Sequence, residues 1–173
     1  MWIYQKQLQH PVKIERPNPR LAGIIITALG GPDGELAASM RYLNQRYTMP
    51  DGRVVGILTD VGSEELGHME MVGSIVYQLT RNLTPDEIMA GGFDKYYVDH
   101  GAAIYPASAA GVPFNAASIA SKEDALASIH EDLAADAAIT QMQPLSKNRR
   151  KALKYKVFSH FGKTLKICHP AII

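Results

Sequence analysis

The chain has 173 residues, of which 46% are hydrophobic and 20% are charged, and its formal net charge is +1. This composition is typical of a globular domain with a buried core, and no apolar run of about 18 residues predicts a membrane span. The N-terminus lacks the apolar stretch of a secretory signal and the single cysteine, Cys168, excludes an internal disulfide, so we expect neither secretion nor a membrane partner.

The first two predicted helices are separated by a break. Asn18-Pro19 is the pattern of an N-cap followed by proline, and the apolar residues 21–29 then predict a helix. The Gly/Pro-rich residues 30–34 predict a kink or short interruption. A helix is expected again over residues 35–47, with an apolar stripe formed by Leu36, Met40, Leu43 and Tyr47. Glu35 lies beside this stripe in the first turn, where the helix dipole favours an anion, and the local pattern alone favours a solvated side chain.

The longest predicted helix runs from Val54 to Thr80 and contains the most informative pattern in the chain. Glu65 and His68 fill two steps of its apolar series, whose other members are Leu58, Val61, Val72, Ile75 and Leu79. An acid and an imidazole therefore face the expected core. Because burying an unpaired carboxylate costs several kcal/mol, a partner is required, and a metal ion binds an anionic oxygen and a neutral imidazole together. Glu-x-x-His directed inward is the ligand unit of di-iron and di-manganese helix bundles.

The segments around this helix are shorter or less regular. Residues 49–52 form a tight turn, so the helices on either side are expected to pack antiparallel. Thr84-Pro85-Asp86-Glu87 predicts the start of a short helix, which Gly91-Gly92 ends. Residues 93–120 are rich in Ala, Gly, Ser and Pro, and they predict a long packed loop between the second and third core helices.

A third long helix is expected after residue 120. Ser121-Lys122-Glu123-Asp124 has the form of a capping box. The apolar stripe beyond it consists of Leu126, Ile129 and Leu133. The next step of the same series is Asp136, so a carboxylate again falls on the predicted core face. His130 and Glu131 lie beside the stripe and are expected to be exposed.

The balance of acidic and basic residues changes after residue 136. Residues 137–173 contain eight Lys or Arg and no acid, whereas residues 1–136 contain ten basic and seventeen acidic residues. We therefore predict a unit over residues 1–136 and a basic C-terminal segment over residues 137–173. Eight positive charges more often belong to a solvated or protein-binding segment than to a nucleic-acid site, so no nucleic-acid partner is expected.

Three stretches carry a resemblance to a known family. Residues 35–47 (ELAASMRYLNQRY), 60–68 (DVGSEELGH) and 130–136 (HEDLAAD) resemble the non-haem manganese catalases. Within that family the similarity is strongest to the small spore-coat (CotJC-type) proteins, which also begin with a Met-Trp stretch like Met1-Trp2. The similarity extends continuously from residue 1 to about residue 136.

The resemblance implies an all-α, ferritin-like four-helix bundle around two manganese ions. By analogy with the family, Glu35 and His68 ligate one ion, and Glu65 bridges both ions and is the residue most directly involved in catalysis. The third and fourth helices of the family supply a glutamate and a histidine to the second ion, and Asp136 occupies the glutamate position. The implied reaction converts two hydrogen peroxide molecules to oxygen and two waters.

Two departures from the family pattern concern the second ion. Asp136 is one methylene shorter than the family glutamate, and the fourth helix is not recognisable. His160 precedes the stretch 161–167, which is similar to the segment after the family's ligand histidine, while His169 lies at about the family's spacing from Asp136. Either histidine is a candidate ligand. We hypothesise that an altered reading frame accounts for this last fifth of the chain.

Three functions follow as open alternatives. The first is a manganese catalase of the cytoplasm or the spore coat, active or impaired by its atypical C-terminus. The second is a structural coat subunit that has the catalase fold but an incomplete metal site. The third is a different ferritin-like protein that holds iron, because ligand types do not separate manganese from iron. Homo-oligomerisation is expected in each case, and other spore-coat proteins are candidate partners.

Overall fold

The computed structural model describes residues 3–142, except residues 4, 6, 99–102, 105 and 120–123 and the side chains of residues 97, 98, 103 and 136–142. Five α-helices are present in this part of the chain: α1 (Pro19–Gly30), α2 (Glu35–Gln45), α3 (Gly52–Thr80), α4 (Pro85–Ala90) and α5 (Ala125–Met142). Three 3-10 turns accompany them: η1 (Arg46–Thr48), η2 (Asp94–Tyr96) and η3 (Ala116–Ser118). A two-stranded antiparallel hairpin, β1 (Tyr97–Val98) and β2 (Ala103–Ile104), lies in the long loop.

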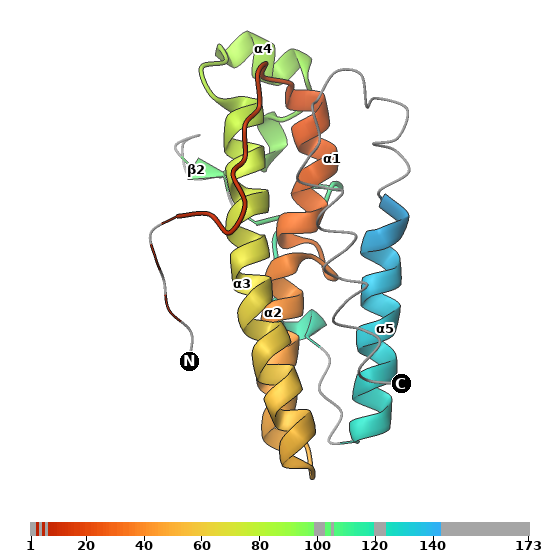
Figure 1. Ribbon diagram of the computed structural model, residues 1–173. Coiled ribbons are helices and arrows are strands. Elements are labelled where there is room, and N and C mark those ends of the chain that lie inside the picture. The colour runs from red at the N-terminus through yellow and green to blue at the C-terminus, as the bar shows by residue number, and fades with distance from the viewer. Residues whose placement is uncertain are drawn as a thin grey trace.

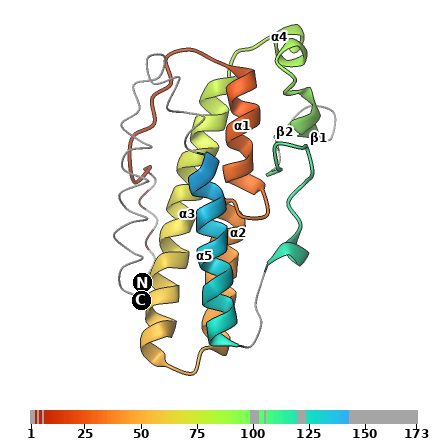
Figure 2. The same ribbon diagram turned by 90° about the vertical axis from the view of Figure 1, so that its right-hand side faces the viewer.

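The long helices form a bundle, which confirms the predicted fold class. In Figure 1, α1 and α2 follow one another down the molecule, α3 returns along both of them, and α5 lies beside α2. Figure 2 shows the N-terminal segment on one side of the bundle and the loop after α4 on the other. The predicted fourth helix falls beyond the described residues. No helix in the described ranges is long and apolar enough to cross a membrane.

The break between α1 and α2 is confirmed and has a clear local cause. The Asn18 side chain accepts a hydrogen bond from the Leu21 N–H at 3.0 Å and so begins α1, with proline in its first turn. At the other end the Gly31 N–H bonds to the Thr27 carbonyl, and the Gly34 N–H bonds to the Gly31 carbonyl. The chain thus turns within residues 31–34 and starts a new helix at Glu35.

The core divides into an upper and a lower cluster along α3. The upper cluster joins α1, the second half of α3 and the aromatic pair Phe93 and Tyr96, whose ring centroids are 4.7 Å apart. The lower cluster is smaller and joins α2 to the first half of α3 through Ala38, Tyr42, Met49 and Leu58. The apolar stripe predicted for α3 is therefore confirmed, with Leu58, Val72, Ile75 and Leu79 all buried.

The stripes predicted for α2 and α5 are only partly confirmed, because Leu36, Leu43 and Ile129 are half-buried but the other predicted members are exposed. Met40 on α2 is exposed, as is Tyr47, which lies in η1 because α2 ends at Gln45, before the predicted end. The buried residues of α2 are Glu35, Ala37, Ala38, Ser39, Arg41, Tyr42 and Gln45. On α5, Leu126 is 67% exposed and Leu133 is 38% exposed, and the buried side chains among residues 125–135 are Ser128, Asp132 and Ala135. Both helices bury mainly small and polar residues, so a search for large apolar residues identifies their buried faces only in part.

The segments after α3 follow the predicted turn chemistry. Thr84 and Glu87 form a reciprocal capping box at the start of α4, and its end at Gly91 agrees with the prediction. The cap of α5 is Asp124, whose carboxylate accepts a hydrogen bond from the Ala127 N–H at 2.7 Å. This residue was predicted as the last member of a capping box begun by Ser121, which lies outside the described residues. α5 itself continues to Met142, across the division predicted at residues 136 and 137.

Candidate metal centre

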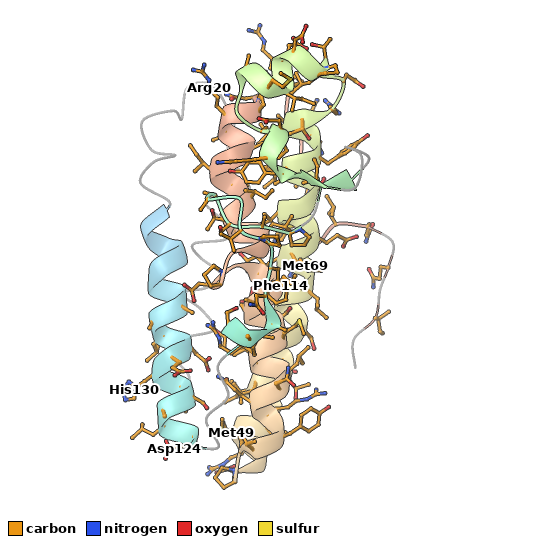
Figure 3. All side chains as sticks on the ribbon, turned by 180° about the vertical axis from the view of Figure 1, so that it is seen from behind. Arg20, Met49, Met69, Phe114, Asp124 and His130 are labelled. Atoms are coloured by element: carbon orange, nitrogen blue, oxygen red, sulfur yellow. The ribbon has the colours of Figure 1, made fainter. Side chains whose placement is uncertain are left out.

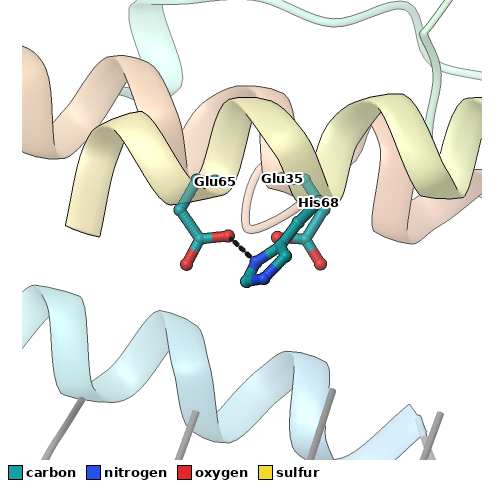
Figure 4. Close-up of side chains that lie close together, drawn as sticks. All are labelled: Glu35, Glu65 and His68. Carbon is teal, nitrogen blue, oxygen red and sulfur yellow. Dashed lines mark hydrogen bonds and ion pairs between the residues drawn. The ribbon is translucent and has the colours of Figure 1, made fainter. Parts of the chain in front are cut away.

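Three acidic and imidazole side chains converge in the middle of the bundle. Glu35 is the first residue of α2, and Glu65 and His68 lie one turn apart on α3. Their exposed fractions are 5%, 6% and 4%, respectively. One ligand atom from each lies within 4.8 Å of the other two. Figure 4 shows all three side chains extending from α2 and α3 in the direction of α5.

The position of each side chain follows from the helices that carry it. Glu65 and His68 are buried on α3 between Leu58 and Val72, as the apolar series predicts. Glu35 is buried too, so the local reading of it as a solvated residue is wrong. The break before α2 directs the first turn of that helix into the bundle, where Gly34 provides no side-chain cap. A carboxylate in this turn is favoured by the positive end of the helix dipole.

The donor atoms have a spacing that suits one metal ion. The Nδ1 atom of His68 lies 2.8 Å from the Oε2 atom of Glu65, close enough to share a hydrogen. Adjacent donors on an ion with bonds of about 2.1 Å are about 3 Å apart, so little movement is needed for both to bind it. On the other side of the ring, Nε2 lies 3.8 Å from Oε1 of Glu64.

The donor types also restrict the metal. Two carboxylates and one imidazole are hard or borderline ligands, which suit manganese, iron or zinc better than a thiolate-selected metal. The residues present therefore fit a first-row divalent ion in charge, donor type and spacing. Within the described residues, Glu35, Glu65 and His68 are the group that meets these conditions.

The other predicted ligands have side chains outside the part of the chain that the structure describes. Asp136 lies in α5, but its side chain is outside the description, as are His160 and His169. His130 is exposed as predicted, and Figure 3 shows it on the side of α5 away from the bundle. The assignments of Asp136, His160 and His169 as ligands stay predictions.

Sequence reasoning missed Asp132, a buried carboxylate on the inner face of α5. Its exposed fraction is 5%, and its Oδ1 atom accepts a hydrogen bond of 3.0 Å from Nε2 of Gln45. The sequence did contain a signal for it. The inner face of α5 reads Ser128, Asp132, Ala135, a series of small and polar residues that is also spaced by three and four.

A groove of about 720 Å³ lies on the outer side of α3 and does not open onto the cluster. The N-terminal segment forms one wall with Leu8 and three glutamine side chains, and α3 forms the other with Glu64, Leu66 and Glu70. Glu65 and His68 are not among its lining residues. The groove and the cluster therefore occupy different faces of α3, with Glu64 between them.

Comparison with known proteins agrees with this geometry. The sequence model of the family described as "Manganese containing catalase" matches residues 1–145. The chain is 51% identical over 136 residues to Protein CotJC of Bacillus subtilis (strain 168), an alignment that covers 79% of this chain and 71% of CotJC. It is 31% identical over 138 residues to a probable manganese catalase of Clostridium acetobutylicum, covering 79% of this chain and 61% of the relative.

A solved structure shows the same fold. The crystal structure of KatB, a manganese catalase from Anabaena, superposes with a TM-score of 0.73 at 25% sequence identity, over 83% of this chain and 64% of KatB. The chain thus spans roughly two thirds of the length of these relatives, and the metal-suited cluster lies within the shared part. On the family match and on these relatives, the chain belongs to the manganese-containing catalase family.

Proposed function

We propose that this protein disproportionates hydrogen peroxide at a dinuclear manganese site, one half of which is formed by Glu35, Glu65 and His68. The observation that carries the proposal is the burial of these three donors within 4.8 Å of one another. A buried pair of carboxylates beside an imidazole is costly without a cation, and a divalent ion offsets that cost directly. Family membership makes manganese the expected metal.

The proposed role of each side chain follows from its position. In Figure 4 the Glu65 side chain lies beside those of Glu35 and His68, and all three extend toward α5; by analogy with the family, Glu65 would bridge the two ions. Glu35 and His68 would complete the ligand set of the first ion. Asp136 and a histidine from the C-terminal segment are expected to ligate the second ion. The carboxylates supply negative charge that stabilises the oxidised state of a bound metal.

When bound, two manganese ions would together be able to accept two electrons and return them. In the overall reaction one peroxide loses two electrons and two protons to become oxygen, and a second peroxide accepts both to become two waters. The contribution of the protein is a site shielded from bulk solvent, since all three donors are nearly inaccessible. Such shielding limits the escape of partially reduced oxygen species.

A second candidate function is a structural role in a spore coat. It is favoured by the 51% identity to CotJC and by the atypical residues 137–173, which bear on the second ion. In this role the bundle provides a packing unit, and the cluster holds at most one ion. A di-iron protein is the third candidate, which the same ligands allow.

Metal content and oxygen evolution separate these functions. The protein is expressed with manganese, dialysed, and assayed for manganese and iron per chain and for oxygen released from peroxide. About two manganese per chain with oxygen release is expected for the catalase. Glu65→Gln should abolish both, whereas Asp60→Asn, which alters an exposed acid on the same helix, should change neither.

Two outcomes contradict the catalase. About one manganese or less per chain, without oxygen release, would leave the structural role. Preferential retention of iron without oxygen release would favour the di-iron protein.

A further inference from the structure

The contact between α2 and α5 contains a buried polar cluster that the proposed metal site does not use. Gln45 is fully buried, Ser128 is fully buried, and Asp132 is 5% exposed. Nε2 of Gln45 donates a hydrogen bond of 3.0 Å to Oδ1 of Asp132, across 87 positions of sequence. Asp132 is not part of the group suited to a metal, so this carboxylate requires a different explanation.

Apolar packing provides little to fix α5 against α2. Over the part of α5 whose side chains the structure describes, residues 125–135, the buried residues are Ser128, Asp132 and Ala135, and Leu126 and Leu133 are exposed. Small side chains leave shallow ridges and grooves, so neighbouring registers differ little in packing energy. A directional bond between two buried polar groups is satisfied in one register only, and such groups often specify helix alignment at some cost in stability.

The direction of the helices connects this bond to the metal-suited cluster. α2 runs toward the turn at Met49 and α5 runs away from that end, so the two helices are antiparallel (Figures 1 and 3). Following α5 from Asp132 toward Met142 therefore leads in the direction of Glu35. Position 136 is four residues further on, about 6 Å along the axis and on the same helical face.

We propose that the Gln45–Asp132 hydrogen bond positions α5 so that its next turn presents position 136 to the dinuclear site. Gln45 and Asp132 are positioning residues and do not touch the metal. A slip of one residue would turn position 136 by about 100° and move it by about 1.5 Å, which is enough to lose a ligand. This inference rests on the proposed function, because it concerns the second ion of the same site.

The test compares two uncharged variants of Asp132, one with and one without a hydrogen-bond acceptor. Asp132→Asn keeps an acceptor oxygen for Gln45, and Asp132→Ala removes it. Manganese per chain is measured after dialysis, and electron paramagnetic resonance distinguishes an exchange-coupled pair from an isolated Mn(II) ion. We expect Asp132→Ala to fall from about two manganese to about one, with the signal of an isolated ion, and Asp132→Asn to resemble the wild type.

Two further variants separate positioning from general destabilisation. Leu79→Ala creates a cavity in the upper cluster and should lower stability while leaving two coupled ions. Gln45→Met removes the donor with little change in size. It should also lower the manganese content to about one ion per chain, so it tests the inference even if Asp132→Ala does not fold.

Specific results would overturn the inference. Two coupled ions in both Asp132→Ala and Gln45→Met would show that the bond does not position α5. Equal loss in Asp132→Asn and Asp132→Ala would show that the charge of Asp132 matters and the hydrogen bond does not. A wild-type protein with fewer than two ions would instead contradict the proposed dinuclear site, and the positioning role with it.

Discussion

Replacing Gly30 with alanine tests how closely the loop after α4 packs against the end of α1. A Cβ atom at this position would lie 2.3 Å from the carbonyl carbon of Pro106 and 2.4 Å from the amide nitrogen of Ala107. Both are backbone atoms, which cannot rotate away as a side chain can. The loop would have to withdraw by about 1 Å to restore an ordinary contact distance.

The expected cost follows from what this movement disturbs. Overpacking of this kind costs about 1–3 kcal/mol. The Pro106 carbonyl accepts a hydrogen bond from the Phe114 N–H at 2.9 Å, and the Ala109 N–H donates to the Thr27 hydroxyl at 2.7 Å. Weakening either bond adds about 0.5–1.5 kcal/mol, while the better helix propensity of alanine returns about 0.5–1 kcal/mol. We therefore expect Gly30→Ala to destabilise the protein by about 1–3 kcal/mol.

The matched control is the same substitution at Gly56. This glycine lies in α3 with nothing within 4 Å of the added Cβ, so alanine there should stabilise the protein by about 0.5–1 kcal/mol. Urea denaturation and thermal denaturation, each followed by far-ultraviolet circular dichroism, measure the free energy of unfolding and the Tm of both variants. A shift of about 2–4 °C in Tm per kcal/mol is expected for a chain of this size. If Gly30→Ala stabilised the protein as much as Gly56→Ala does, the close packing of residues 106 and 107 on α1 would be wrong.

Three further predictions address the site, the pH dependence and the core. Glu65→Gln should remove bound manganese more completely than Asp136→Asn, because a bridging ligand serves both ions; equal loss of metal per chain would count against the bridging role. The Thr84 N–H, and then its hydroxyl, hold the pKa of Glu87 below its ordinary value of 4.5. The stabilisation by Glu87 is therefore complete above pH 4.5 and is lost as the pH falls through the lowered pKa. The difference in urea midpoint between wild type and Glu87→Gln should shrink in acid. A difference that stays constant with pH would contradict the capping role. Leu79→Ala should cost about 2–5 kcal/mol in urea denaturation, whereas Leu126→Ala should change stability by less than about 0.5 kcal/mol, opposite to what its sequence pattern predicts.

The fold could be predicted from sequence wherever local chemistry and burial agree. Asn18, Thr84 and the glycines around residue 31 set helix ends through hydrogen bonds within a few residues, which a sequence displays directly. The long apolar series of α3 also contained enough repeats to identify its buried face. Glu65 and His68 were found because they interrupt that series.

The failures share a physical cause. On α2 and α5 the inward faces contain Gln45, Asp132 and small residues, whose burial depends on a partner helix far away in the sequence. Propensity and periodicity describe one helix at a time and cannot show that two polar groups satisfy each other. Glu35 was misread for the same reason, since its burial depends on how the break after α1 directs the next helix.

The three donors of the cluster lie on one helical hairpin, within residues 35–68. Glu65 and His68 are neighbours on one helix, and Glu35 is about 30 residues from them, a shorter separation than the one that brings α5 to the bundle, so less chain entropy is lost in closing it. If the proposed site is correct, its first ion would need only α2 and α3 and would not require α5. Bound metal would then hold α2 against α3 and present a finished surface on which the later helices assemble.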